Sequence, residues 1–397
     1  MRAPTTPAEL FQLIIQSELL DRGRLEAYWE GVRAAGAVPT DAAACGQLLV
    51  ADGLLTQFQA RILLQGKWKN FFLGGKYKVL DQLGAGGMGA VFLCEHRFMR
   101  RRVAVKILPP DRIHSPSVLQ RFYREAEAIA RLDHPNIVRA HDVGHHGSVC
   151  FLVLEYIDGV NLQRLVEGQG PLPVLRAVNY AVQAAQGLHC AHRAGLVHRD
   201  VKPANLLLDR FGVIKVLDLG LALFADGRPK SGDTSAQAGL LGTADYIAPE
   251  QAQDAGQADA RSDVYSLGCT LYFMLAGQTP YHGGSVAQKL ALNQTTAAAA
   301  VANFRQEVPA GVADAVRRML AKDPAERPAS ALAAAEFLRP WFKVVPAPPA
   351  EELPTLQFGQ HGDLDAMART MSASRTLQGG LLEEKTVPIS QGKRAGV

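Results

Sequence analysis

Polar residues suited to phosphoryl transfer stand in a fixed order in the middle of the chain. Residues 198–207 read HRDVKPANLL, and DLG follows at residues 218–220. Transfer of a phosphoryl group to a hydroxyl needs a carboxylate that receives the proton and oxygen ligands that hold Mg²⁺. Asp200 can receive the proton, while Asn205 and Asp218 can supply the oxygen ligands. These residue types are improbable in this order by chance, so the stretch predicts a phosphoryl-transfer site.

A glycine-rich segment, GAGGMGAV at residues 84–91, lies between two strand-like runs. Because Gly84, Gly86 and Gly89 lack side chains, backbone N–H groups there can approach phosphate oxygens closely. The same glycine spacing occurs in dinucleotide-binding folds, but in those folds a helix follows the glycines. Here AVFLCEH continues as a strand. Taken alone, the segment leaves open a phosphate-binding loop and an ordinary hairpin turn.

A lysine and a glutamate further along could act together on a nucleotide. Lys106 ends the alternating run VAVK, and Glu125 lies in the amphipathic stretch RFYREAEAIARL. A carboxylate at this place could hold the lysine ammonium so that it meets the α- and β-phosphates of ATP. The plainer alternatives are an exposed strand lysine and a solvated glutamate, and Glu127 is a rival for the same role.

The first part of the chain has a helical pattern. Between residues 8 and 67, apolar residues recur at three- and four-residue spacing, which predicts a module of about four helices over residues 1–70. Thr40 is expected to cap the third helix, and Thr56 with Gln59 has the capping-box spacing for the fourth. The plain interpretation of this module is packing without chemistry.

The pattern changes at Tyr77 to short β-type runs, which predict an antiparallel sheet. From Val174 onward helical periodicity dominates, with short strand-like pieces between the helices. We therefore expect an α+β fold with a small β-rich half and a larger α-rich half. Residues 343–397 are rich in Pro and then in Ser, Thr, Gly and Gln, which predicts a disordered tail.

Composition excludes several classes of protein. The chain has 42 basic and 38 acidic residues, and this net charge of +4 gives no strong field that would argue for binding to nucleic acid or to a membrane surface; we expect no nucleic-acid partner and no membrane span. The local exception is Arg97 with Arg100–Arg102, interpreted as a solvated turn. The 5 cysteines form no Cys-x-x-Cys pair, and no apolar run is long enough to span a bilayer. A cytoplasmic protein is therefore expected.

Residues 77–342 resemble the eukaryotic-type (Hanks-type) protein kinase catalytic domain, and most of all the bacterial serine/threonine kinases of that family. The resemblance rests on several motifs in family order. They are the glycine loop, VAVK, HRDVKPAN, DLG, GTADYIAPE at 242–250, SDVYSLG at 262–268 and DPAERP at 323–328. It implies a bilobal fold, with an N-lobe over residues 77–156 and a C-lobe over residues 157–342.

The resemblance also implies a role for each catalytic residue. Lys106 would contact the nucleotide phosphates with Glu125 as its helix partner, and Asp200 would be the catalytic base. Lys202 would neutralise the γ-phosphate, while Asn205 and Asp218 would hold Mg²⁺, with Mn²⁺ as an alternative. The implied ATP site comprises Leu83, Gly84, Gly86, Gly89, Val91, Ala104, Lys106, Leu154, Glu155, Ile157 and Leu207.

Other family positions imply structural support. Glu250 is expected to pair with Arg327, and Asp263 to hold the catalytic loop. One residue departs from the family pattern: Leu219 stands where a phenylalanine usually follows the metal-binding aspartate. Leucine keeps an apolar packing group next to the metal ligand, so we expect phosphoryl transfer to be retained.

The type of hydroxyl that accepts the phosphoryl group, and the sites of regulation, can be inferred from the same motifs. Lys202 and Thr243 are typical of serine/threonine kinases, which phosphorylate protein substrates and often themselves. Thr234 and Ser235 lie between Asp218 and Glu250 and are candidate regulatory phosphosites; the alternative is that they are ordinary loop residues. Phosphorylated tail threonines could bind phosphothreonine-reading domains. The rival interpretation, a catalytically dead scaffold, predicts the loss of a catalytic residue, and none is missing.

Overall fold

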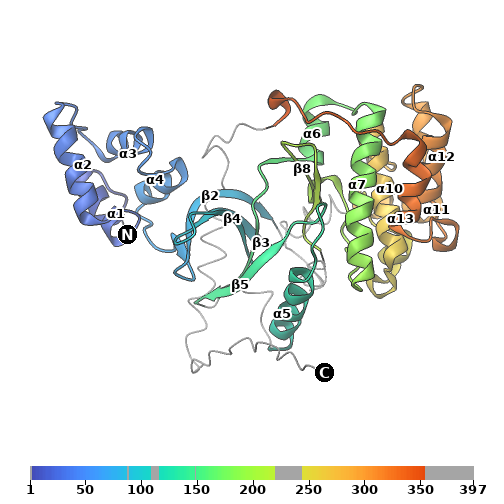
Figure 1. The fold of residues 1–397 in the computed structure, drawn as a ribbon, viewed down its shortest axis with the longest axis horizontal. Coiled ribbons are helices and arrows are strands. Elements are labelled where there is room, and N and C mark those ends of the chain that lie inside the picture. Colours follow the sequence, from blue (N-terminus) through green and yellow to red (C-terminus); the bar gives the residue numbers. More distant parts are fainter. Residues whose placement is uncertain (1, 87–88, 109–115, 148, 220–243, 354–397) are drawn as a thin grey trace, which may run out of the picture.

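The computed structural model describes residues 2–86, 89–108, 116–147, 149–219 and 244–353. Figure 1 shows three parts in chain order: a group of helices at the left, a curved sheet in the centre and a larger helical part at the right. The last two are the expected small β-rich and larger α-rich halves, so the α+β two-lobed fold is confirmed.

Four helices form the N-terminal module, as the apolar spacing predicted. They are α1 (Pro7–Gln16), α2 (Arg22–Ala34), α3 (Ala42–Ala51) and α4 (Gln57–Leu64). Thr56 and Gln59 form the expected capping box at the start of α4. The predicted cap of α3 was wrong by one residue, because the Asp41 carboxylate and not the Thr40 hydroxyl accepts the Ala44 N–H, at 2.8 Å. A carboxylate caps as well as a hydroxyl and adds a favourable charge at this helix end.

The module shares one hydrophobic core with the sheet. Phe58 of α4 is fully buried and meets Phe92 of the sheet with ring centroids 6.2 Å apart. At the same interface the Thr56 hydroxyl donates to the carbonyl of Leu80, and the buried Gln59 amide donates to the carbonyl of Val79, each at 2.6 Å. The module and the sheet therefore belong to one continuous hydrophobic core.

The N-lobe sheet has six strands in the order β1-β2-β3-β4-β6-β5, and every neighbouring pair is antiparallel. Its elements are β1 (Phe72–Leu73), β2 (Tyr77–Gly86), β3 (Gly89–His96), β4 (Arg102–Ile107), β5 (Ala140–His146) and β6 (Val149–Glu155), with helix α5 (Pro116–Ala130). Strand β1 precedes the Tyr77 boundary expected from the sequence. In the register between β4 and β6, Ala104 lies opposite Leu154.

The C-lobe surrounds one buried helix. Its helices are α6 (Leu162–Gln169), α7 (Val174–Arg193), α9 (Pro249–Gln253), α10 (Ala260–Ala276), α11 (Val286–Thr295), α12 (Ala310–Met319) and α13 (Ala331–Leu338). Its small antiparallel sheet has the order β7 (Gly159–Asn161), β8 (Leu206–Asp209) and β9 (Ile214–Val216). Single 3₁₀ turns are η2 (Pro203–Asn205), η4 (Ala255–Gln257), η5 (Val301–Asn303), η6 (Pro324–Glu326), η7 (Arg339–Trp341) and η8 (Ala350–Glu352). Helix α10 is buried from Ser262 to Leu275, so it anchors the lobe.

Residues 343–353 lie against the C-lobe, although the sequence predicted a disordered tail from residue 343. The Asn179 amide of α7 donates to the Lys343 carbonyl at 2.7 Å. One turn earlier on the same helix, Arg176 forms two hydrogen bonds to the Glu352 carboxylate, at 2.8 and 2.5 Å. Two anchors on α7 therefore hold this segment, and the predicted tail beyond it, residues 354–397, lies outside the described residues.

Within the described ranges, no helix is both long enough and apolar enough to span a membrane.

Candidate active site

The loop between α7 and β8 carries the residues that sequence motifs singled out. The Asp263 carboxylate, buried on α10, accepts the backbone N–H groups of His198 and Arg199, each at 2.8 Å. Arg199 has a left-handed backbone (φ +67°), which is unusual for a residue with a long side chain. The two bonds to Asp263 hold this conformation, which confirms the prediction that Asp263 supports the loop.

His192 adds a contact that the sequence did not reveal. Its ring Nε2 lies 2.7 Å from the Asp263 carboxylate, and both side chains are buried. An ionised carboxylate only accepts hydrogen bonds, so the ring donates from Nε2. His192 therefore completes the set of donors that orient Asp263 under the loop.

Asp200 is fixed by two neighbours in the same loop. The Asn205 amide nitrogen donates to the backbone carbonyl of Asp200 at 2.8 Å and to its carboxylate Oδ2 at 3.0 Å. The Lys202 Nζ lies 2.9 Å from the same Oδ2. Two donors on one oxygen leave the carboxylate little rotational freedom, so its orientation is set before any substrate arrives.

Asp218 follows β9 and is joined to the loop through the backbone. The N–H of Leu217 donates to the Asn205 carbonyl at 2.9 Å, and the His198 ring nitrogen lies 2.7 Å from the Leu217 carbonyl. Asp218 itself has a left-handed backbone (φ +59°). These links fix the segment that carries Asp218 beside the one that carries Asn205.

Lys106 pairs with Asp218 in this structure. Its Nζ lies 2.7 Å from the Asp218 Oδ2, and the Lys106 side chain is only 3% exposed. The sequence predicted Glu125 as the partner, but the recorded ion pair of Lys106 is with Asp218. Burial raises the pKa of Asp218, but the charge and hydrogen bond of Lys106, together with His198 and Lys202, lower it by more, so the pKa lies below its usual range. The Asp218 carboxylate is therefore ionised at neutral pH.

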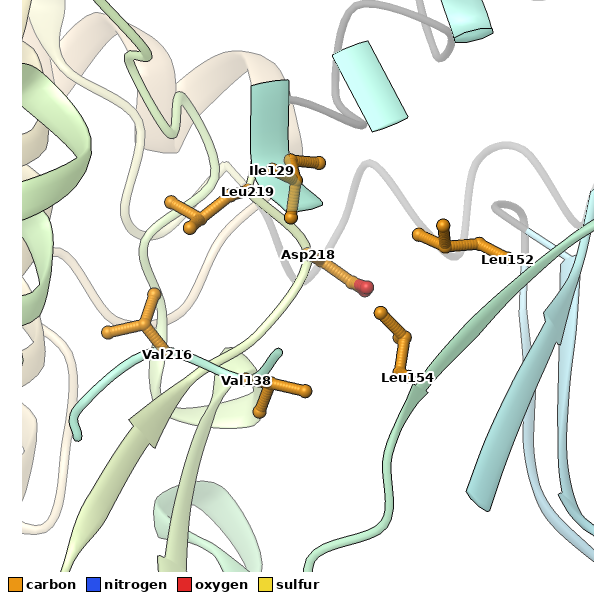
Figure 2. Close-up of a pocket in the computed structure, with 7 residues that line it drawn as sticks. All are labelled: Ile129, Val138, Leu152, Leu154, Val216, Asp218 and Leu219. Carbon is orange, nitrogen blue, oxygen red and sulfur yellow. The ribbon is translucent and has the colours of Figure 1, made fainter. Parts of the chain in front are cut away.

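A small pocket opens beside Asp218 (Figure 2). Apolar side chains from α5, the segment before β5, β6 and the end of β9 with the residues after it surround it: Ile129, Val138, Leu152, Leu154, Val216 and Leu219. Leu154, one of the residues of the implied ATP site, lies at this wall. The other lining residues, Leu219 apart, were not singled out from the sequence. Nothing in a lone buried Ile or Val distinguishes a pocket wall from ordinary core.

The apolar residues of the implied ATP site lie mostly in one cluster. Val91, Ala104, Leu154 and Ile157 pack together with the side chains of α5. Leu207 lies on β8 across from Asn161 and is half-buried. Glu155, at the end of β6, forms an ion pair with Lys215 at 3.2 Å.

The glycine segment closes the β2–β3 hairpin. Strand pairing joins Ala85 to Ala90 and Gly86 to Gly89, and Gly89 has a φ of +107° that suits glycine alone. Gly84 pairs with Val91, and Leu83 is exposed at 38%. Strands β2 and β3 thus pair up to Gly86 and Gly89, and β3 continues from Gly89 as a strand, as expected, with no helix beginning there.

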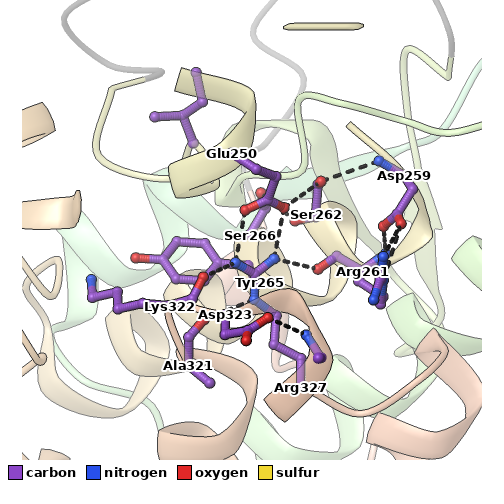
Figure 3. A network of polar contacts seen from close by, with 12 residues as sticks. Glu250, Asp259, Arg261, Ser262, Tyr265, Ser266, Ala321, Lys322, Asp323 and Arg327 are labelled. Carbon is purple, nitrogen blue, oxygen red and sulfur yellow. Dashed lines mark hydrogen bonds and ion pairs between the residues drawn. The ribbon is translucent and has the colours of Figure 1, made fainter. Parts of the chain in front are cut away.

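The predicted pair of Glu250 and Arg327 is confirmed (Figure 3). Two guanidinium nitrogens of Arg327 lie 2.7 and 2.8 Å from the Glu250 carboxylate, and the Ser262 hydroxyl donates to it at 2.6 Å. Arg327 also donates to the carbonyls of Ala321, Lys322 and Arg261. Its fully buried side chain is satisfied by these partners, which join α9 to the segment before α13.

Several predicted residues lie outside the described part of the chain. They are Gly220, Thr234, Ser235 and Thr243, as well as the tail threonines beyond Leu353.

The two-lobed fold and the set of Lys106, Asp200, Asn205 and Asp218 define a phosphotransferase of the protein kinase class. A family model described as "Protein kinase domain" matches residues 77–342. The chain belongs to this protein kinase family, whose members use ATP and a divalent metal ion.

Curated relatives are bacterial serine/threonine kinases. The chain is 43% identical over 219 residues to the serine/threonine-protein kinase PknB of Mycobacterium tuberculosis, covering 54% of this chain and 34% of PknB. It is 37% identical over 256 residues to PrkC of Bacillus subtilis, covering 64% of this chain and 39% of PrkC. The chain thus matches little more than a third of the length of these relatives.

A similar solved structure is the PknI kinase domain of M. tuberculosis. It is 29% identical, has a TM-score of 0.53 and covers 67% of this chain and 95% of the PknI chain.

Proposed function

We propose that this protein is a serine/threonine protein kinase that transfers the γ-phosphoryl group of ATP to seryl and threonyl hydroxyls of proteins, itself included. The observation that carries the proposal is the geometry at Asp200, whose carboxylate is oriented by Asn205 and Lys202. The relatives PknB and PrkC are named as serine/threonine kinases, which supports the same acceptor.

Each residue has a part in the transfer. The acceptor hydroxyl oxygen bonds to the γ-phosphorus, the bond from that phosphorus to the β–γ bridging oxygen breaks, and ADP leaves. The hydroxyl proton passes to the Asp200 carboxylate. Lys202 balances negative charge on the γ-phosphate, and Lys106 contacts the α- and β-phosphates. The Lys106–Asp218 pair supports this assignment, because it keeps the ammonium next to a predicted metal ligand.

Asn205 and Asp218 fit the requirements of a magnesium site. The Asn205 amide nitrogen faces Asp200, so its amide oxygen is the group left to bind a cation. Asp218 supplies an ionised carboxylate, and oxygen ligands of this kind suit Mg²⁺ and also Mn²⁺. When bound, the ion supplies positive charge to the phosphate oxygens.

The proposal also covers the regulatory phosphosites and the cellular location of the protein. Thr234 and Ser235 are the proposed regulatory phosphosites, because they lie in sequence between Asp218 and Glu250. Phosphorylated tail threonines are proposed to bind phosphothreonine-reading domains. A cytoplasmic location is supported by the 5 free cysteines, since a reducing compartment keeps thiols unpaired.

The test is incubation of the full chain with labelled ATP and Mg²⁺, with phosphosites read by mass spectrometry. Asp200→Asn keeps the size of the side chain but removes the proton acceptor, so incorporation is expected to fall by a factor of about 10³. Asp133→Asn is the matched control, because Asp133 is exposed and pairs with Arg139 at the surface. Equal labelling of wild type and Asp200→Asn would instead support the rival interpretation, a catalytically dead scaffold.

A further inference from the structure

The turn between β3 and β4 presents two large apolar side chains to solvent. Phe98 is 77% exposed and Met99 is 75% exposed. The turn is well bonded: the His96 N–H donates to the Arg101 carbonyl at 2.8 Å, and the Arg100 N–H donates to the His96 carbonyl at 2.9 Å. The His96 ring also accepts the N–H groups of Phe98 and Met99. Residues 97–101, here named the hairpin tip, therefore hold both side chains outward in a defined shape.

Positive charge is concentrated around the hairpin tip. Residues 61–102 contain nine lysines and arginines against the two acidic residues Asp81 and Glu95, although the whole chain carries only +4. Four of these cations, Arg97 and Arg100–Arg102, flank Phe98 and Met99 directly. Lys76 and Lys78 lie at the same end of the N-lobe, because strand pairing places Tyr77 opposite His96 and Lys78 opposite Glu95.

Contacts between elements bring further cations to the same surface. The Arg97 N–H donates to the Lys76 carbonyl at 2.8 Å, which joins the hairpin tip to the β1–β2 turn. Burial lowers the pKa of Lys78; Glu95 raises it, and the neighbouring cations Arg24 and Arg100 lower it further. Arg24 lies on α2, so the N-terminal module contributes to this basic surface.

Acidic neighbours do not cancel this charge. Glu95 pairs with Arg100 at 3.0 Å, and Asp142 lies 3.8 Å from Lys76. Both are surface pairs with at least one well-exposed partner, and such pairs hold their side chains only weakly. The arginines can therefore turn toward another anion without a large cost.

We propose that the hairpin tip docks this protein on an anionic lipid bilayer, with Phe98 and Met99 inserted at the interface and the flanking arginines against headgroup phosphates. An acidic protein surface would satisfy the arginines but would leave two protruding apolar side chains without an apolar medium. A bilayer offers both, since apolar side chains enter the acyl boundary while long cationic side chains reach the headgroups. The hairpin tip lies at the opposite end of β3 from Gly89, so docking leaves the glycine turn open.

The test is co-sedimentation of the full chain, without ATP, with phosphatidylglycerol/phosphatidylcholine vesicles and with phosphatidylcholine vesicles. The wild type is expected to bind the anionic vesicles, and less so at high salt. Phe98→Ser/Met99→Ser is expected to weaken the partition on the order of tenfold or more. Phe211→Ser is the matched control, because Phe211 is 76% exposed in another turn and lies next to an arginine, Arg210, that pairs with Asp158.

Three outcomes overturn the proposal. They are no binding of the wild type to anionic vesicles, equal loss in the Phe211→Ser control, and binding of soluble polyglutamate that equals vesicle binding and survives Phe98→Ser/Met99→Ser. The last outcome identifies an acidic protein partner. Kinase activity in solution, measured on each variant, is expected to equal that of the wild type and reports on folding. Since vesicle binding needs no ATP, this test and the test of the proposed kinase activity fail independently.

Discussion

Lys106 is buried and forms an ion pair with the partly exposed Asp218, so the two residues depend on each other. The Lys106 side chain is 3% exposed, so loss of the Asp218 charge leaves an ammonium buried without its anion. Asp218→Asn is therefore expected to lower the free energy of unfolding of the nucleotide-free chain by about 3 kcal/mol. Lys106→Met/Asp218→Asn removes both charges and is expected to recover part of this loss. Urea unfolding of the wild type, of Asp218→Asn, of Lys106→Met and of the double variant measures the coupling, and additive losses would contradict it.

At the same scale, the sequence identified some site residues and missed others for a physical reason. Asp200, Lys202 and Asn205 lie within one loop, so their order in the sequence is enough to predict that their side chains lie close together. The ion pair of Lys106 with Asp218 was not predicted, because it depends on how the Asp218 segment lies against β4, and the role of Glu125 as helix partner stays a prediction. His192 was missed because a single histidine on a helix has no pattern that distinguishes it from other core residues.

The link from α9 to the segment before α13 shows how one contact can stabilise several elements. Burial raises the pKa of Glu250, but hydrogen bonds from Arg327, Ser262 and the backbone of Glu250, together with the Arg327 charge, lower it by more, so the native pKa lies below the usual range. A carboxyl with a lowered native pKa stabilises the fold above the ordinary glutamate pKa of about 4.3, and this stabilisation is lost as pH falls through the native pKa.

Glu250→Gln should therefore change stability in a pH-dependent way. At neutral pH the variant leaves the Arg327 charge buried and is expected to be less stable by about 3 kcal/mol. Below about pH 4.3 the gap should narrow, because the wild type loses the contribution of its carboxylate while the variant has none to lose. Urea midpoints across this pH range measure the gap. A gap that stays constant would contradict the assignment of the lowered pKa to Glu250.

Elements with strong local signals were predicted well. The capping box of Thr56 and Gln59 starts α4 as expected, because both partners are local in sequence. The segment 343–353 was expected to be disordered, because its Pro-rich composition has little core of its own. It is ordered by Arg176 and Asn179 of α7, which are distant in sequence and so leave no local pattern.

For the whole molecule, the shared core predicts that module and N-lobe lose stability together. Phe58 is fully buried and contacts Phe92, so Phe58→Ala removes a ring from the interface itself. The variant is expected to be less stable by about 3–4 kcal/mol. Amide hydrogen exchange should show reduced protection in α1–α4 and also in β2 and β3. Val38→Ala is the control, since Val38 is 48% exposed, and loss of protection confined to the helices would contradict a common core.

The two hydrogen bonds from α4 to β2 have a mechanical consequence. Thr56 and Gln59 hold the carbonyls of Leu80 and Val79, and only Asp81, Gln82 and Leu83 separate this anchor from Gly84. The module is thus hydrogen-bonded to the strand that continues, through two register irregularities, to Gly84. A ligand that shifted α4 would therefore displace β2 close to the glycine segment. The N-terminal module is thus a site outside the catalytic domain from which the position of this segment can be changed.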